Sequence, residues 1–225
     1  MENGAYVLFD LDDTLYPAGA GLMREISARI TRYVAEHLRI SWDAADALRR
    51  EYYLRYGSAV RALVNQHHLD LADFLAFAHD VEVEHYLTPD ADLDCLLGCI
   101  QAPKAIFTNA PRAYAESVLR ALGIEQHFVR MFDYEFGEYL GKPDAAVYRR
   151  VQAALGVPSD RLVMVDDAAT LALAFPPGQV KTWRLHAHWD GTPSGSIRSA
   201  TAPTHAWISS CAISGRLRAH FSNWA

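Results

Sequence analysis

Two aspartates near the start of the chain, Asp10 and Asp12, follow a short apolar run that is typical of a buried strand. Because they are two residues apart, an extended backbone directs both side chains to the same side. Two neighbouring carboxylates can divide the work of a hydrolysis, since one can attack as a nucleophile while the other moves a proton. The spacing therefore indicates a catalytic pair at the end of this strand.

Polar residues also follow two later apolar runs. Thr108 and Asn109 come after the second expected strand, and Asp166 and Asp167 come after the third. Lys142 lies in a loop before an expected helix. The carboxyl ends of parallel strands meet at one edge of a sheet, so we expect these groups to converge there. Carboxylates suit Mg²⁺, while a hydroxyl and a lysine suit phosphoryl oxygens, so the set predicts a site for a metal ion and a phosphate group.

The elements that must position these residues alternate between strand and helix. Apolar runs predict strands at residues 5–11, 105–108, 128–133, 162–165 and 180–185. Helical spacing predicts two helices, at 111–122 and 144–155, each followed directly by a glycine. This alternation predicts an α/β fold, with a parallel sheet covered by helices.

A long helical segment interrupts the alternation between the first two strands. Apolar residues recur with helical spacing from Leu22 to Leu38, and Ser41 is the expected N-cap of a second helix that continues to Tyr53. Two further helical patterns cover residues 59–67 and 71–79. We therefore expect residues 20–98 to form a helical insertion.

The C-terminal part of the chain is rich in Gly, Pro, Ser and Thr between residues 189 and 203, which predicts a loop or tail there. An edge strand at 206–209 and a closing helix at 212–221 are expected beyond it. Residues 189–225 are therefore an extension of uncertain role in the predicted architecture.

Composition limits the possible partners. The chain has 225 residues, 21 Lys and Arg against 27 Asp and Glu, and a net charge of −6, so it lacks the basic character of a protein that binds nucleic acid polymers.

Apolar runs are too short to span a membrane, and aspartates stand where a signal peptide needs apolar residues. The three cysteines, Cys95, Cys99 and Cys211, are expected to be reduced. We therefore expect a soluble, cytoplasmic protein that is a monomer or a homodimer.

Four ordered segments carry a resemblance to a known family. They are Phe9-Asp10-Leu11-Asp12-Asp13-Thr14-Leu15-Tyr16, Phe107-Thr108-Asn109, Gly141-Lys142-Pro143-Asp144 and Val165-Asp166-Asp167. In this order they resemble the haloacid dehalogenase superfamily of phosphohydrolases over about residues 5–185. Three further features resemble its pyrimidine 5′-nucleotidase-like subfamily, namely Pro17 after the first segment, Gly21-Leu22, and Tyr56-Gly57-Ser58.

The resemblance implies an architecture and a set of residue roles. The core would be Rossmann-like and formed by residues 1–19 and 99–225, with residues 20–98 as an inserted helical cap. Asp10 would be the nucleophile that forms an aspartyl-phosphate, and Asp12 would protonate the leaving oxygen and then activate water. Thr108 and Lys142 would hold the phosphoryl group.

The resemblance also implies a metal site. Mg²⁺ would be bound by Asp10, by the backbone carbonyl of Asp12 and by Asp166, with Asp167 supporting these ligands. The segment 168–177 departs from the family pattern, because the family usually continues after the acidic pair with a small hydroxyl residue and a polar one. This departure puts the support of the metal site in question.

The expected function is hydrolysis of a small phosphorylated metabolite, a nucleoside 5′-monophosphate with a pyrimidine base preferred. Asn109 and Tyr56 are candidate substrate contacts. Further cap residues that could contact a base or ribose are Tyr52, Tyr53, Arg61, His67, His68 and His79. Alternative substrates are phosphoglycolate or a sugar phosphate, and a second alternative is a non-catalytic binding domain. Dehalogenation is disfavoured, because the dehalogenases of this superfamily lack the aspartate that stands here at position 12.

Overall fold

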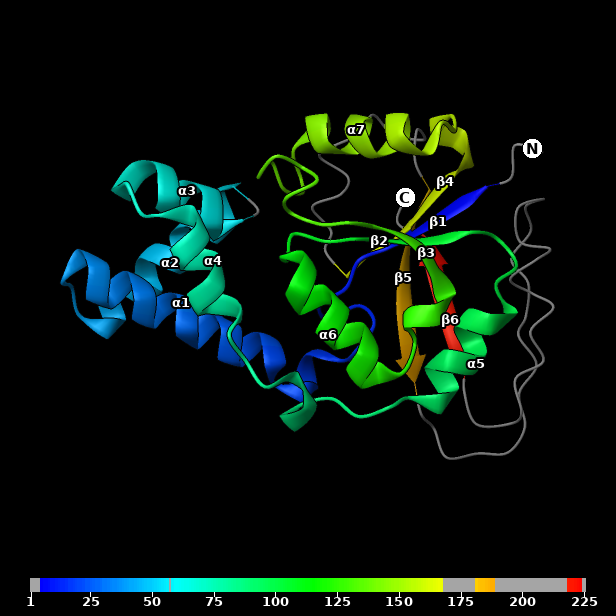
Figure 1. Ribbon diagram of the computed structural model, residues 1–225, viewed down its shortest axis with the longest axis horizontal. Coiled ribbons are helices and arrows are strands. Elements are labelled where there is room, and N and C mark those ends of the chain that lie inside the picture. The colour runs from blue at the N-terminus through cyan, green and yellow to red at the C-terminus, as the bar shows by residue number, and fades with distance from the viewer. Residues whose placement is uncertain (1–4, 57, 168–180, 189–217, 224–225) are drawn as a thin grey trace.

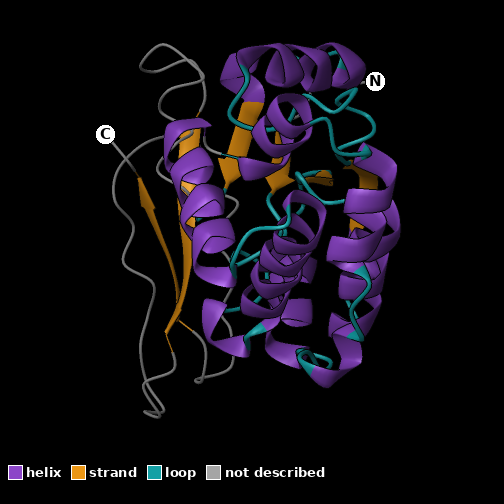
Figure 2. Ribbon diagram, turned by 90° about the vertical axis from the view of Figure 1, so that its left-hand side faces the viewer, coloured by secondary structure: helices purple, strands orange, loops and turns teal. Residues whose placement is uncertain are grey.

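The computed structural model describes residues 5–56 and 58–167, together with the backbone of 181–188 and 218–223. Its centre is a six-stranded sheet with the order β3-β2-β1-β4-β5-β6 (Figure 1). The strands are β1 (Tyr6–Phe9), β2 (Lys104–Phe107), β3 (Phe128–Phe132), β4 (Leu162–Val165), β5 (Lys181–His188) and β6 (Arg218–Asn223). Strands β1 to β5 pair in parallel, and β6 is antiparallel to β5 at one edge (Figure 2). The predicted α/β fold with a parallel sheet is confirmed.

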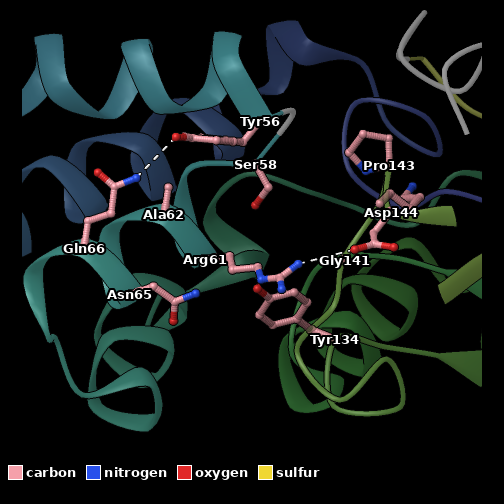
Figure 3. Close-up of a pocket in the computed structure, with 11 residues that line it drawn as sticks. Tyr56, Ser58, Arg61, Ala62, Asn65, Gln66, Tyr134, Gly141, Pro143 and Asp144 are labelled. Carbon is pink, nitrogen blue, oxygen red and sulfur yellow. Dashed lines mark hydrogen bonds and ion pairs between the residues drawn. The ribbon is translucent and has the colours of Figure 1, made fainter. Parts of the chain in front are cut away.

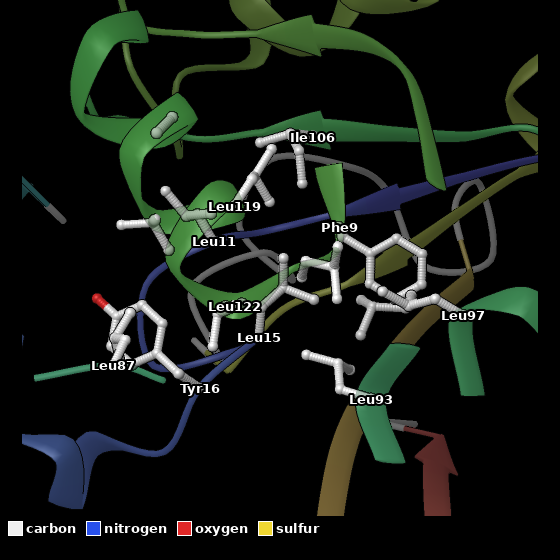
Figure 4. Packing of buried hydrophobic residues seen from close by; sticks show 14 of the residues in the cluster. Phe9, Leu11, Leu15, Tyr16, Leu87, Leu93, Leu97, Ile106, Leu119 and Leu122 are labelled. Atoms are coloured by element: carbon white, nitrogen blue, oxygen red, sulfur yellow. The ribbon is translucent and has the colours of Figure 1, made fainter. Parts of the chain in front are cut away.

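The two strands at the centre of the sheet, β1 and β4, consist of apolar and aromatic residues because both of their faces are covered. Alternate side chains of β1 enter two different hydrophobic clusters: Phe9 packs with α5 (Ala91–Cys99) and α6 (Arg112–Leu122), and Leu8 packs with α7 (Ala145–Leu155). Figure 1 shows α7 on one side of the sheet and α5 and α6 on the other. Figure 4 shows Phe9 among the leucines of the first cluster. This packing fixes the strand ends that carry the polar residues.

The inserted segment forms four consecutive helices that project from one side of the core (Figure 1). They are α1 (Leu22–Leu38), α2 (Trp42–Tyr56), α3 (Ala59–His67) and α4 (Leu71–His79), and we call them the helical cap. Their shared cluster is built on Tyr33, Leu63 and Phe74. The expected N-cap of α2, Ser41, is confirmed, because the Ala44 backbone N–H donates to Ser41 Oγ at 3.3 Å.

The last helix of the 20–98 segment, α5, packs against the sheet and does not belong to the cluster of the helical cap. Leu93, Leu96 and Leu97 of α5 lie in the cluster beneath the sheet with Phe9 and Ile106, and not in the cap cluster. The structure therefore places α5 with the core. Short 3₁₀ turns at Ala18–Ala20, Val83–His85, Glu125–His127 and Ser159–Arg161 complete the described elements.

Two expectations from the sequence are corrected by the structure. Residues 218–221 were expected in a closing helix, but they belong to β6, whose backbone pairs with β5 from Trp183↔Asn223 to His188↔Arg218. Cys95 is a free, exposed thiol, whereas Cys99 is disulfide-bonded, so the expectation of a reduced thiol is wrong for Cys99.

Several expectations fall on residues outside the described part of the chain. These are Cys211, the segment 168–177, the loop at 189–203, the strand at 206–209, and the part of the closing helix before residue 218. Within the described residues, no helix is both long and apolar enough to cross a membrane.

Candidate active site

Asp10 lies just past the end of β1, where its backbone N–H donates to the Val165 carbonyl of β4 at 2.8 Å. The chain then turns instead of staying extended, because the N–H groups of Thr14 and Leu15 both return to the Leu11 carbonyl. Asp10 and Asp12 nevertheless line one cavity of about 400 Å³. The sequence predicted that the two carboxylates share a site, and the turn is the means by which they do so.

Lys142 connects the ends of β1 and β4. Its Nζ donates to Asp10 Oδ1 at 2.7 Å and to Asp166 Oδ2 at 2.8 Å, and all three side chains are almost buried. Burial alone would lower the pKa of Lys142, but the two carboxylates outweigh it and raise this pKa. Lys142 is therefore a fixed positive charge in the cavity.

The surroundings of Asp10 shift the pKa of its carboxyl group. Burial raises its pKa above the ordinary value, Lys142 opposes this shift, and Asp166 and Asp12 add to it. Thr14 supports the same carboxyl, because its hydroxyl donates to Asp10 Oδ2 at 3.1 Å and accepts from the Asp167 backbone N–H at 3.1 Å. Thr14 was not predicted as a site residue, although it belongs to the first of the four segments that carry the family resemblance.

Thr108 follows β2 and is fully buried beside the same cavity. Its Oγ1 accepts the Ala110 backbone N–H at 3.0 Å, which leaves the hydroxyl hydrogen available to a ligand oxygen. Asn109 is also at the cavity, but its side chain bonds the backbone of Lys142 at both the N–H and the carbonyl. Asn109 therefore positions the lysine loop.

The side chain of Asp12 is held by two tyrosines. Its Oδ1 accepts from the Tyr16 hydroxyl at 2.5 Å and from the Tyr114 hydroxyl at 2.8 Å. Burial and the Asp12 carboxylate raise the pKa of both tyrosines, so both hydroxyls keep their hydrogens. Neither tyrosine was predicted as a site residue, because Tyr16 stood out only as part of the first segment of the family resemblance and Tyr114 has the spacing of an ordinary packing residue on α6.

Three carboxylates could share a cation. Asp10, Asp166 and Asp167 each offer an oxygen, and these oxygens lie within 4.8 Å of one another. An all-oxygen, negatively charged set fits Mg²⁺. The Asp12 side chain is outside this group, which leaves its backbone carbonyl as the predicted contribution.

The helical cap contributes residues to the cavity that contains Asp10 and Lys142. Arg49, Tyr53 and Ser58 line the same cavity as Asp10 and Lys142, as does His79 at the end of α4. Desolvation and the nearby carboxylates of Asp167, Asp166, Asp10 and Asp13 raise the pKa of Tyr53. The main cavity is thus lined by cap and core residues together.

A second cavity of about 440 Å³ lies beside the first, between α3 and the loop that carries Lys142 (Figure 3). Arg61 reaches across it to Asp144 of the core, with 3.3 Å between Nη1 and Oδ2. Tyr56 lines this cavity and accepts a hydrogen bond from Gln66 at 3.3 Å. Ser58 and Lys142 line both cavities, so the two are adjacent.

The other cap candidates lie elsewhere. Tyr52 is buried in the cap and bonds Gln66 and His67, and His68 ends α3 in a left-handed conformation. None of Tyr52, His67 and His68 is among the residues that line the two described cavities.

Comparison with known proteins assigns the family. The model of the haloacid dehalogenase-like hydrolases matches residues 5–175, which is most of the chain. The chain belongs to the haloacid dehalogenase-like hydrolase family. The match spans both the helical cap and the strands that carry Asp10, Thr108 and Asp166.

Individual relatives of this hydrolase are distant. It is 26% identical over 168 residues to Phosphate metabolism protein 8 of Saccharomyces cerevisiae, a match that covers 67% of this chain and 51% of the relative. The chain thus spans about half the length of that protein. Two solved dehalogenase structures, one of them an intermediate complex, share 19% identity with this chain, with TM-scores of 0.52 and 0.51. These alignments cover 87% and 86% of this chain and 89% and 88% of the other chains, and they support the fold.

Proposed function

We propose that this hydrolase is a Mg²⁺-dependent phosphomonoesterase that acts through an aspartyl-phosphate. One observation carries the proposal: Lys142 bridges Asp10 and Asp166 in a cavity that Asp12 and Thr108 also line. The cavity therefore combines a nucleophile, a proton carrier and donors for a phosphoryl group. The match to a yeast protein named for phosphate metabolism agrees with this chemistry.

In the first step a carboxylate oxygen of Asp10 attacks phosphorus, and the bond from phosphorus to the ester oxygen breaks. Lys142 and the Thr108 hydroxyl hold the phosphoryl oxygens and offset their developing charge. Asp12 gives its proton to the leaving oxygen, so the alcohol departs neutral. The products of this step are the alcohol and a phosphorylated Asp10.

In the second step Asp12, now a carboxylate, takes a proton from water as the water oxygen attacks phosphorus. The bond from phosphorus to Asp10 breaks, inorganic phosphate leaves, and the original protonation states return. A bound Mg²⁺ would neutralise phosphoryl charge, and Asp10, Asp166 and Asp167 are the carboxylates near enough to one another to hold it. The positive charge of Lys142 reduces the electrostatic repulsion between the carboxylates of Asp10 and Asp166.

The second cavity supports a nucleoside 5′-monophosphate as substrate, with a pyrimidine base preferred. It opens beside Lys142, and its lining includes the amides of Asn65 and Gln66 and the rings of Tyr56 and Tyr134 (Figure 3). Amides can hydrogen-bond the polar edge of a base, and aromatic rings can stack on its face. Its volume of about 440 Å³ is sufficient for a group of that size.

Dehalogenation is the competing function, because the similar solved structures include dehalogenases. A halide leaves as an anion and needs no proton, so an enzyme for that reaction gains nothing from an acid such as Asp12. The two hydrogen bonds that fix Asp12 beside Asp10 therefore favour an oxygen leaving group. The acidic cluster around Asp166 has no evident use in carbon–halogen cleavage either.

Phosphate release from UMP, CMP, phosphoglycolate and a sugar phosphate, with and without Mg²⁺, tests the proposal. Asp10→Asn should abolish release, and Asp43→Asn, which alters an exposed residue of the cap, is the matched control. Arg61→Ala should raise KM for nucleotides and not for p-nitrophenyl phosphate. Release from the other phosphates alone would reject the nucleotide, activity retained in Asp10→Asn would reject the mechanism, and halide release from 2-chloropropionate alone would favour a dehalogenase.

A further inference from the structure

We propose that Tyr16 and Tyr114 are positioning residues that fix the side chain of Asp12 so that one chosen oxygen carries its proton to the leaving group. Both hydroxyls reach the same atom, Asp12 Oδ1, at 2.5 and 2.8 Å. The inference rests on the proposed function, because it concerns how the acid of the phosphomonoesterase is aimed.

Counting hydrogens identifies the oxygen that reacts. Each tyrosine has one hydroxyl hydrogen, and both are directed to Oδ1, whose two lone pairs they occupy. The 3.2 Å contact between the two hydroxyl oxygens then needs no hydrogen of its own. No hydrogen bond from the described residues reaches Oδ2. The transferable proton of Asp12 therefore belongs on Oδ2.

The two donors come from separate parts of the fold. Tyr16 is six residues after Asp10, and its ring is buried beside Leu87 and Leu122 of the core cluster (Figure 4). Tyr114 is on α6, and its ring is also buried. Two rigid, buried rings from different elements converge on one atom, so the carboxyl group has little freedom to rotate.

The helical cap supplies a third support. The ring of His79, at the end of α4, packs edge-on against Tyr114 with 5.1 Å between centroids. His79 is itself held, because its Nδ1 bonds the Leu75 carbonyl at 3.0 Å. His79 also lines the main cavity, so the support of Tyr114 comes from the wall of the substrate site.

The test is the dependence of kcat/KM on the leaving group for Tyr16→Phe, Tyr114→Phe and the double variant. With Mg²⁺ present, kcat/KM reports the transfer to Asp10, in which Asp12 acts as acid. Methyl phosphate releases a strongly basic oxygen that needs a proton, whereas p-nitrophenyl phosphate releases a stable anion. We expect kcat/KM to fall about tenfold or more for methyl phosphate in each single variant and less than about threefold for p-nitrophenyl phosphate.

Tyr33→Phe is the matched control, because it removes a tyrosine hydroxyl that donates to Asp73 at 2.6 Å inside the cap. It should leave the leaving-group dependence unchanged. An equal loss for both substrates in Tyr114→Phe would mean a merely structural role and would overturn the inference while leaving the proposed function standing. Failure of the wild-type enzyme to hydrolyse any phosphate ester would overturn the proposed function and the inference with it. If Tyr16→Phe does not fold, Tyr114→Phe alone decides.

Discussion

Asn109 forms two hydrogen bonds with the backbone of Lys142, one through each polar atom of its side-chain amide. Its Nδ2 donates to the Lys142 carbonyl at 3.0 Å, and its Oδ1 accepts the Lys142 N–H at 2.7 Å. The residue directly after Thr108 thus holds the loop that carries the lysine, 33 positions further along the chain. Asn109 therefore ties the position of Lys142 to that of Thr108, the two residues that we propose hold the phosphoryl group.

Asn109→Asp should weaken this link. The new carboxylate keeps the acceptor for the Lys142 N–H, but it loses the donor to the Lys142 carbonyl and repels that oxygen. We expect the free energy of unfolding to fall by about 2 kcal/mol and kcat to fall about tenfold or more. Urea unfolding and steady-state kinetics measure the two effects, and unchanged values would show that the loop holds Lys142 without Asn109.

Gly141→Ala should disturb the same loop from the other side. A Cβ at this position would lie 2.6 Å from Asn109 Oδ1 and 2.9 Å from Tyr134 Cε2, which is too close for either contact. We expect a loss of about 1–3 kcal/mol in stability together with reduced kcat. Gly19→Ala is the control, because no atom lies within 4 Å of the place that its new methyl group would take. Equal thermal unfolding of the two variants would contradict the prediction.

Lys142→Met should leave Asp10 and Asp166 close together without their shared cation. Removing one partner of a buried ion pair destabilises a protein by about 3–5 kcal/mol at neutral pH. The deficit should shrink at pH 5, because protonation of one carboxyl removes the repulsion. Turnover should be lost at both pH values. Thermal unfolding with EDTA and with Mg²⁺ provides the check, and Mg²⁺ should raise Tm more in the variant than in the wild type.

Asp13→Asn should stabilise the metal-free enzyme at neutral pH. Burial, with Asp167 and Asp12 nearby, raises the pKa of Asp13 to about 6, and no described group pairs with its buried Oδ1. A carboxyl with a raised folded-state pKa binds more protons when folded, so the free energy of unfolding falls as pH rises from about 4 to 6.

The gain from the substitution should be about 1 kcal/mol at pH 7 and absent near pH 4, after allowance for the water that reaches this half-buried group. Asparagine also tolerates the positive φ of 56° at this position. Urea unfolding in EDTA at both pH values measures the difference. A constant difference between wild type and variant across this range would contradict the assigned pKa.

The sequence alone was sufficient to predict a helix or strand where residues at its own ends determine where it stops. The helices at 59–67 and 71–79 were predicted with the bounds that the structure has, since a left-handed residue ends the first and Asp70 caps the second. The strand at 162–165 was predicted equally well, because a short apolar run between polar residues has few alternatives. The convergence of Asp10, Lys142 and Asp166 followed from the rule that parallel strands share an edge.

Contacts between distant segments were not predictable in this way. Residues 218–221 are too few for their pattern to separate a helix from a strand, and the pairing with β5 decides for a strand. Tyr114 has the spacing of an ordinary core residue of α6, and its hydroxyl gains a role only because Asp12 lies next to it in space. The packing of α5 on the core likewise depends on Phe9 and Ile106, which lie in other elements.

The edge-on contact between His79 and Tyr114 joins two parts of the molecule that do different work. His79 ends α4 of the helical cap and lines the main cavity, whereas Tyr114 of the core donates a hydrogen bond to Asp12. Under the proposed function, a substitution that displaces His79 would therefore also change the packing of the tyrosine that orients Asp12. In the proposed mechanism, the wall of the substrate cavity and the orientation of the acid thus share one ring contact.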